Sequence, residues 1–272
     1  MARTPDWMRS AGAAETPPEI RARSPHPARV WDYWLGGKDN FAADRETAEL
    51  LLDVLPQWGD LARADREFLI RVVRFFMTDA RLHQIVDIGA GIPTSPNVHE
   101  VAQAIRSTAQ VCYVDNDPLV LAHARALLRG GTQGRVDCVQ ADLRSPRSLM
   151  ESAGVDRTQP VGLTLLAVLE FLPDQQEARS ALLRLTEAVP SGSYVAVAHP
   201  LRSPAMDEAL RRWNLRSTVP ARARTEAEIT ELLSGMDILE PGLVPLPEWR
   251  PAPDTQYRGR DLPFVGVVAR TR

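Results

Sequence analysis

The fold of this chain is decided by one stretch, QIVDIGAGIPT at residues 84–94. Its β-branched residues favour an extended strand. Gly89 and Gly91 then allow a sharp turn whose backbone can approach a ligand closely. The next residues predict a helix start, with Ser95 as the N-cap and Pro96 in the first helical position. A strand, a glycine turn and a helix in this order are typical of the opening unit of a nucleotide-binding α/β domain.

Strand and helix patterns alternate after this unit. Apolar runs predict strands at residues 111–114, 135–139, 161–169, 193–198, 237–239 and 264–269. Helical periodicity predicts helices at residues 119–129, 174–188, 206–215 and 225–233. In the proline-rich stretch 241–263 we expect no regular structure. The order predicts an α/β fold with a mainly parallel, seven-stranded sheet and helices on both faces.

The chain is expected to form a single domain behind an N-terminal tail. Residues 1–24 are rich in Arg, Ala and Pro and lack the apolar core of a signal peptide, so we expect a mobile tail. The domain, 25–272, divides into a helical N-terminal extension with a flap at 25–82 and a Rossmann-like core at 83–272.

Two helices are predicted in the extension, at residues 42–55 and 59–80. The second carries four arginines that alternate with acidic residues: Arg63, Arg66, Arg71 and Arg74. Charges of mixed sign are ordinary on a solvated helix face, which favours that interpretation over a basic patch.

An aromatic segment at residues 25–41 precedes these helices and contains Trp31, Trp34 and a Gly36-Gly37 pair. Two interpretations are open. The tryptophans pack on the body of the domain, or the segment is a flap over a ligand, with rings that stack on it and glycines that approach it.

The composition narrows the classes of function. A net charge of −3 gives no electrostatic case for binding nucleic acid or an anionic membrane. The two cysteines lie in apolar, strand-like runs, which is typical of reduced thiols, and we expect a cytoplasmic protein. His83, His99 and His123 lack the spacing of metal ligands, so no metal site is expected. The oligomeric state is left open.

Three acidic residues adjoin the carboxyl ends of the first three strands. Asp87 precedes the glycine turn, Asp115 ends the second strand and Asp142 follows the third. Asp115 is suited to accept hydrogen bonds from ribose hydroxyls, and Asp142 from an adenine amino group. Each could instead be a capping or turn-forming aspartate. Thr94 stands where a dinucleotide fingerprint has its third glycine, which favours S-adenosylmethionine over NAD.

These motifs resemble those of class I S-adenosylmethionine-dependent methyltransferases. The segments PARVWDYWLGGKDNF at 27–41, NVHE at 97–100 and EPGLV at 240–244, with Pro93-Thr94, are similar to a bacterial S-adenosyl methyltransferase family long catalogued as a domain of unknown function. The similarity extends from Pro25 to the C-terminus. It implies a last strand, 264–269, that runs antiparallel to the others.

The resemblance also implies the cofactor, S-adenosylmethionine, and supports the flap interpretation. The residues assigned to cofactor binding are Tyr33, Gly37, Lys38, Asp87, Gly89, Ala90, Gly91, Asp115, Asn116, Asp142, Leu143 and Ala167. Members of this family usually have His at the position of Glu170.

Two residues are candidate general bases, Glu170 after the fourth strand and His199 after the fifth. Glu170 could equally cap a helix, and His199 could satisfy loop backbone groups. We expect the substrate pocket to form from the N-terminal helices, the segment after His199 and the proline-rich stretch with Trp249 and Tyr257. Those two rings could line the pocket or only anchor the stretch.

Three functional classes follow from these observations. The favoured one is a methyltransferase that acts on a small molecule, which requires an open cavity beside the methyl group. The second is a non-catalytic, regulatory S-adenosylmethionine-binding module, in which the methyl end would be sealed. The third, an NAD-dependent oxidoreductase, is disfavoured by Thr94.

Overall fold

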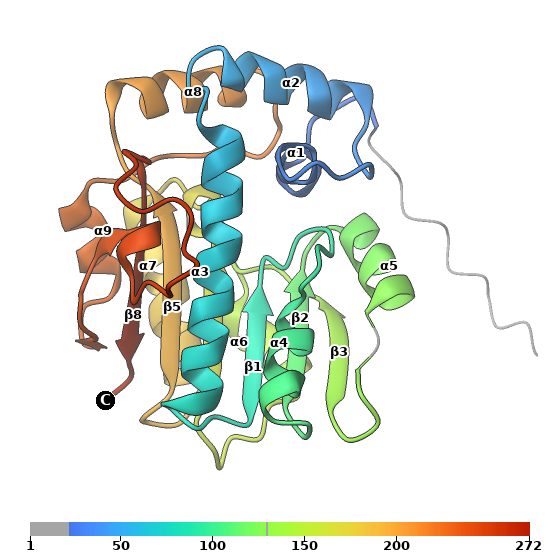
Figure 1. Cartoon of the computed structure of the whole chain (residues 1–272), viewed down its shortest axis with the longest axis vertical. Coiled ribbons are helices and arrows are strands. Elements are labelled where there is room, and N and C mark those ends of the chain that lie inside the picture. The colour runs from blue at the N-terminus through green and yellow to red at the C-terminus, as the bar shows by residue number, and fades with distance from the viewer. Residues whose placement is uncertain (1–21, 129) are drawn as a thin grey trace, which may run out of the picture.

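The computed structural model describes residues 22–128 and 130–272, and the expected tail therefore lies almost entirely outside the described residues. The described residues form a sheet of eight strands in the order β3-β2-β1-β4-β5-β8-β6, with β7 paired to β8 (Figure 1). The strands are β1 (Gln84–Ile88), β2 (Gln110–Asp115), β3 (Arg135–Gln140), β4 (Gly162–Leu166), β5 (Tyr194–Pro200), β6 (Asp237–Ile238), β7 (Val244–Pro245) and β8 (Phe264–Arg270).

The first five strands are parallel, and β8 runs antiparallel to β5, β6 and β7. The predicted α/β sheet, mostly parallel with an antiparallel last strand, is confirmed. The prediction had seven strands because β7 lies in the stretch 241–263, where we expected no regular structure. Pro245 is tolerated there because it lies at the margin of the sheet, where a missing backbone N–H leaves no partner unpaired.

Helices cover both faces of the sheet. They are α1 (Pro27–Trp34), α2 (Ala42–Leu52), α3 (Trp58–Thr78), α4 (Val98–Ile105), α5 (Pro118–Leu127), α6 (Pro146–Ser152), α7 (Gln175–Glu187), α8 (Pro204–Asn214) and α9 (Glu226–Leu232), with short 3₁₀ turns η2 (Leu169–Phe171) and η3 (Leu246–Glu248). Helices α3, α4 and α5 pack on one face, and α6, α7 and α9 on the other. Helices α1, α2 and α8 lie beyond the carboxyl ends of the parallel strands (Figure 1).

Helix α4 begins later than expected. Asn97, not Ser95, is its N-cap, and the backbone N–H of Asn97 donates to the Glu100 carboxylate at 2.5 Å. Asn97 and Glu100 thus form a capping box, in which the side chain of each residue meets the backbone N–H of the other. Such a capping box stabilises the helix start, and Ser95 lies two residues before it. Helices α1 and α6 were not predicted; the aromatic segment thus contains a helix whose first residue is Pro27.

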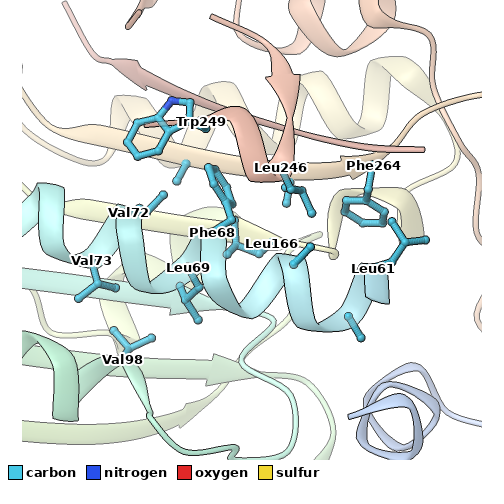
Figure 2. Close-up of a cluster of buried hydrophobic side chains, with 14 of the residues drawn as sticks. Leu61, Phe68, Leu69, Val72, Val73, Val98, Leu166, Leu246, Trp249 and Phe264 are labelled. Atoms are coloured by element: carbon cyan, nitrogen blue, oxygen red, sulfur yellow. The ribbon is translucent and has the colours of Figure 1, made fainter. Parts of the chain in front are cut away.

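The core on one face is organised around α3 (Figure 2). The Phe68 ring is fully buried and meets the Trp249 ring edge to face, with 5.5 Å between the ring centroids. A Cβ at Gly266 would lie 2.8 Å from the Phe68 ring, and one at Gly162 would lie 2.5 Å from the Phe76 ring. Glycine at these two strand positions therefore lets the helix approach the sheet closely.

Arg71 contradicts the expected solvated face of α3. Its side chain is 7% exposed, and its guanidinium donates to the carbonyl oxygens of Trp249 at 3.0 Å and Leu246 at 2.7 Å. The buried carbonyls of the stretch 241–263 need donors, which Arg71 provides. Within residues 22–128 and 130–272, no helix is long and apolar enough to cross a membrane.

Phe68→Ala should lower the free energy of unfolding by about 3–5 kcal/mol, because it removes a buried ring and leaves a cavity between α3 and Trp249. Urea titration measures the effect. The control is Leu215→Ala at a side chain 74% exposed, which should change stability by less than about 0.5 kcal/mol. Equal losses in the two variants would contradict the central place of α3 in the core.

Candidate functional site

A cavity of about 200 Å³ opens at the carboxyl ends of β1, β2 and β4. Its walls come from the glycine turn, the residues that follow β2, β3 and β4, and helices α1, α3 and α8. In an open parallel sheet this is the edge at which ligands bind, because the loops there leave a crevice where the strand order reverses. Strand β1, between β2 and β4, is that reversal point.

The glycine turn and the end of β2 hold each other in place. The backbone N–H groups of Gly89 and Ala90 both donate to the Val114 carbonyl, at 2.8 and 3.1 Å. The Asp115 carboxylate accepts from the Gly91 N–H at 3.0 Å and the Asp117 N–H at 2.9 Å. Burial raises the pKa of Asp115 to about 6, against the opposing effect of these bonds. Gly91 has a φ of +65° and open space where a Cβ would project.

Two other acids at the strand ends also line the cavity. Asp87 is buried, and its carboxylate accepts from the Thr164 hydroxyl at 2.6 Å. Burial raises the pKa of Asp87. Asp142 is more exposed and accepts from the Asn116 side chain at 3.1 Å and from the Arg144 N–H at 2.8 Å. Asn116 therefore links the acids that follow β2 and β3.

Nine of the twelve residues assigned to cofactor binding line this cavity: Asp87, Gly89, Ala90, Gly91, Asp115, Asn116, Asp142, Leu143 and Ala167. The structure does not bring Tyr33, Gly37 or Lys38 into its wall. The Tyr33 hydroxyl donates to Glu49 on α2. A Cβ at Gly37 would lie 1.9 Å from an Asp32 carboxylate oxygen, so this glycine accommodates Asp32, which itself lines the cavity.

Part of the cavity wall is aromatic. Trp34 and Trp58 stack in parallel with 4.4 Å between the ring centroids. Phe171 and Trp213 face each other at 6.3 Å, tilted by 55°. All four rings line the cavity. Trp34 packs on the body of the domain and also lines the cavity, and the flap over a ligand stays a prediction.

Two buried carboxyls also line this cavity. Asp65 on α3 and Glu170 in η2 line the cavity and are 5% and 4% exposed. Among the described residues, one oxygen of each carboxyl has no hydrogen-bond partner. Burial raises the pKa of Asp65 to about 7 and that of Glu170 to about 8, and the nearby charge of Asp65 raises the latter further.

His199, the other candidate base, does not line the cavity. It is fully buried at the end of β5, and its Nε2 accepts from Arg224 at 2.8 Å while its Nδ1 donates to the Pro200 carbonyl at 2.9 Å. Burial and the Arg224 charge lower the pKa of His199 to about 3. The ring is therefore neutral with both nitrogens engaged, which is a structural role.

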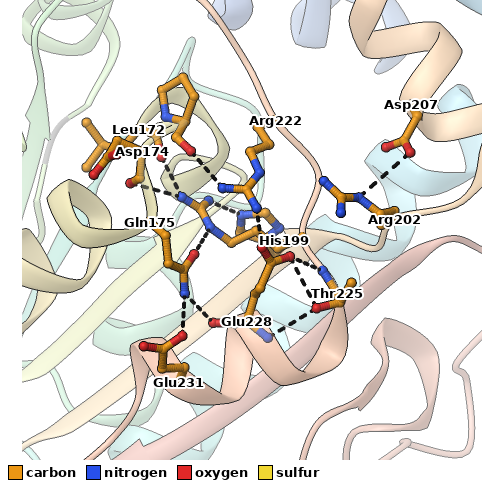
Figure 3. A network of polar contacts seen from close by, with 12 residues as sticks. Leu172, Asp174, Gln175, His199, Arg202, Asp207, Arg222, Thr225, Glu228 and Glu231 are labelled. Carbon is orange, nitrogen blue, oxygen red and sulfur yellow. Dashed lines mark hydrogen bonds and ion pairs between the residues drawn. The ribbon is translucent and has the colours of Figure 1, made fainter.

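His199 lies in a network of polar contacts near Leu172 and Gln175 (Figure 3). Arg224 joins these three residues. Its guanidinium also donates to the Leu169 and Leu172 carbonyls, at 3.0 and 2.5 Å, and to the Gln175 side chain at 2.8 Å. The first two carbonyls flank Glu170. Arg224 thus fixes the turn that carries the Glu170 carboxyl.

The pocket expected from the sequence is partly corrected. The N-terminal helices and the segment after His199 line the cavity, but Trp249 and Tyr257 do not. Both rings are buried against the core, so they anchor the stretch 241–263. The reason is that α3 lies between this stretch and the cavity, and Phe68 on α3 packs against Trp249.

Asp65 and Arg66 are site residues that sequence reasoning missed. The Arg66 guanidinium donates to the carbonyls of Thr94 and Pro96, at 2.7 and 2.6 Å, and holds the loop after the glycine turn. Arg66 therefore does not belong to a solvated face. Helical periodicity was the signal that could have found them. One face of α3 carries four residues that all line the cavity: Trp58, Asp65, Arg66 and Leu69.

Comparison with known proteins places the chain in a family. A family model described as S-adenosyl methyltransferase matches residues 13–272. The chain belongs to this family. The S-adenosyl methyltransferase family also accounts for the predicted resemblance of the motifs at 27–41, 97–100 and 240–244. A search of curated proteins found no match.

Solved structures give the same assignment. The chain is similar to a DUF574 family protein from Streptomyces avermitilis, with 36% identity over 93% of this chain and 100% of that one and a TM-score of 0.89. A putative methyltransferase from Thermobifida fusca has 31% identity over 96% of this chain and 100% of its own, with a TM-score of 0.85. Magnesium protoporphyrin IX methyltransferase from Synechocystis, with bound S-adenosylhomocysteine, shares the fold at 16% identity over 89% of this chain and 93% of its own, with a TM-score of 0.54.

The cofactor of the family is S-adenosylmethionine. The residues of the cavity fit it. The open side of Gly91 leaves room for a ligand against the turn, and the carboxylates of Asp115 and Asp142 offer acceptors for hydroxyl and amino groups. S-adenosylmethionine supplies an electrophilic methyl group. The chain itself has to bind and orient the cofactor and the acceptor, and to remove a proton from an acceptor that must lose one.

Without ligand, stability should fall as the pH rises from about 4.5 to about 8. In the unfolded chain Asp65 and Glu170 lose their protons near pH 4, whereas the folded protein keeps them to about pH 7 and 8. The folded state then binds more protons than the unfolded state. Each group lowers the free energy of unfolding by up to about 1.4 kcal/mol per pH unit in its own interval.

Glu170→Gln should make this slope shallower and raise stability at pH 8 but not at pH 4. Urea titrations at several pH values measure it. Glu187→Gln, at an exposed position at the end of α7, is the matched control and should keep the wild-type slope. An unchanged slope in Glu170→Gln would mean that Glu170 is already ionised at neutral pH in the folded protein.

Proposed function

We propose that the chain transfers a methyl group from S-adenosylmethionine to a small molecule held in the aromatic part of the cavity. The observation that carries this proposal is that one cavity contains both the glycine turn with its strand-end acids and the aromatic walls. A non-catalytic binding module would have a sealed methyl end, and the continuous cavity speaks against it. The helices α1, α3 and α8 around the cavity favour a small acceptor over a macromolecule.

In this proposal each part of the cavity has a separate task. Asp115 accepts hydrogen bonds from the ribose hydroxyls and Asp142 from the adenine amino group. Gly89 and Gly91 let the backbone of the turn approach the cofactor. The aromatic walls exclude water and orient the acceptor, and Glu170 takes a proton from an acceptor that must lose one.

Asp115→Asn should weaken the binding of S-adenosylmethionine by about 1–3 kcal/mol, the range for hydrogen bonds to a charged group. Asparagine is preferred to alanine because it keeps one oxygen for the Gly91 or Asp117 N–H. Calorimetric titration gives the dissociation constant, and circular dichroism checks the fold. Asp137→Asn on β3, which lies outside the cavity wall, should bind as the wild type does. An unchanged constant in the folded Asp115→Asn variant would remove Asp115 from the site.

Transfer itself is tested with S-adenosylmethionine labelled in its methyl group and the low-molecular-weight extract of the source organism. We expect label in a small molecule, and much less with Asp115→Asn at limiting cofactor. Calorimetry with S-adenosylmethionine, S-adenosylhomocysteine and NAD should show binding of the first two only. Cofactor binding without any transfer would favour the binding module, and label in protein alone would exclude a small-molecule acceptor.

A further inference from the structure

We propose that the methyl acceptor is an arylalkylamine, an aliphatic amine attached to an aromatic ring, whose nitrogen lies between Asp65 and Glu170 and whose ring lies among the cavity's tryptophans. This inference rests on the function proposed above and narrows its substrate class. It depends on three features of the cavity: two incompletely paired carboxyls, the absence of a cation paired to them among the described residues, and the aromatic walls beside them.

The first feature is the pair of carboxyls. Asp65 and Glu170 are each more than nine-tenths buried and line the same cavity from α3 and η2. Within the described part of the chain, Oδ1 of Asp65 and Oε2 of Glu170 have no hydrogen-bond partner. Burying a polar atom without a partner costs free energy, and in folded proteins such atoms are uncommon away from functional sites. A ligand that donates to both carboxyls would remove that cost.

The second feature is the charge around the pair. The ionisable groups that face these carboxyls are Asp87, Arg66 and Arg224. Arg66 donates to the Thr94 and Pro96 carbonyls, and Arg224 donates to carbonyls, His199 and Gln175. No ion pair to Asp65 or Glu170 occurs within residues 22–128 and 130–272. Once ionised, the two carboxylates therefore leave this part of the cavity short of positive charge.

The third feature is the aromatic wall. Trp34, Trp58, Phe171 and Trp213 line the cavity, and aromatic faces attract cations as well as flat rings. The Trp213 indole N–H donates to the Val219 carbonyl at 2.7 Å, whereas the indole nitrogens of Trp34 and Trp58 are buried without a partner in the described chain. The wall therefore fits a flat ring that carries a positive charge at one end.

These features together favour an amine over other acceptors. A carboxylic acid would bring a third negative charge to Asp65 and Glu170. A phenol or alcohol supplies one donor for two carboxyls and no compensating charge. An ammonium group supplies three donors and the missing positive charge, so it satisfies both carboxyls at once.

The chemistry balances with Glu170 as the proton acceptor. The ammonium gives one proton to the Glu170 carboxylate, which frees the nitrogen lone pair. That lone pair forms the new nitrogen–carbon bond as the methyl–sulfur bond breaks, and the sulfur keeps the electron pair of the broken bond. The methylated amine leaves as a cation, and the proton on Glu170 passes to water. One proton is released in each turnover.

The test uses three indoles that share one ring: tryptamine, tryptophol and indole-3-propionate. Each is titrated calorimetrically into the full chain saturated with S-adenosylhomocysteine, at pH 7, in two buffers of different ionisation enthalpy. Tryptamine should bind about tenfold or more tightly than tryptophol, and the propionate should bind most weakly. Before the indole binds, Asp65 and Glu170 hold protons at pH 7. The ammonium of tryptamine lowers the pKa values of both carboxyls, so the protein should release about one proton when tryptamine binds and none with the other two indoles.

Variants locate the effect. Glu170→Gln and Asp65→Asn should each reduce tryptamine binding about tenfold and diminish the proton release, and should affect tryptophol less. Glu187→Gln and Asp237→Asn replace exposed acids outside the cavity wall and should bind and release protons as the wild type does. Circular dichroism confirms that each variant is folded.

Several results would overturn the inference. They are equal binding of the three indoles, tightest binding of the propionate, no binding of any of them, or no loss in the Glu170 and Asp65 variants. Proton release on binding S-adenosylmethionine, with none from tryptamine, would assign the carboxyls to the cofactor instead. Cofactor binding is measured first. If S-adenosylmethionine does not bind, the proposed function is wrong as well. If it binds and any of the results above is found, only the proposal of an amine acceptor is wrong.

Discussion

The close packing of α3 against the sheet is the constraint on which the rest of the structure depends. One part of the helix surface, with Phe68 and Phe76, meets the strands where Gly162 and Gly266 leave room for the rings. Another, with Trp58 and Asp65, forms a wall of the cavity. Because both surfaces belong to one rigid helix, the register that fills the core also sets the position of the site. A shift of α3 by one residue would rotate the helix by about 100°, which would move Phe68 and Phe76 out of the core and Trp58 and Asp65 out of the cavity wall.

The cavity beside this stable core contains several buried acidic groups, an arrangement that is electrostatically unfavourable. Asp87, Asp65 and Glu170 are all buried, and their burial raises the pKa of each. Such an arrangement lowers stability unless protons or a bound cation compensate, and proteins retain it chiefly where it has a function. The apolar packing on both faces of the sheet supplies the stability that makes this tolerable.

How far the sequence could predict this structure depended on how local each signal is. The glycine turn, the strand-end acids Asp115 and Asp142 and the succession of strands along the chain, apart from β7, follow from patterns within a few residues, and these were predicted. The burial of Arg71 could not be predicted from such local patterns, because its partners Leu246 and Trp249 lie about 175 residues away in the chain. On an amphipathic helix, a charged residue that will be buried by a distant segment has the same pattern as one that stays in water.

The same reasoning explains why the two candidate bases differ. Glu170 follows β4 and His199 lies at the end of β5, both at the ligand edge, so position in the sequence could not separate them. The difference is Arg224, which lies in the loop before α9 and binds the His199 ring as well as the two carbonyls that flank Glu170. It engages the histidine and holds the η2 turn. Arg224 thus holds the backbone on both sides of Glu170, whose carboxyl is buried, and this burial raises the pKa of Glu170.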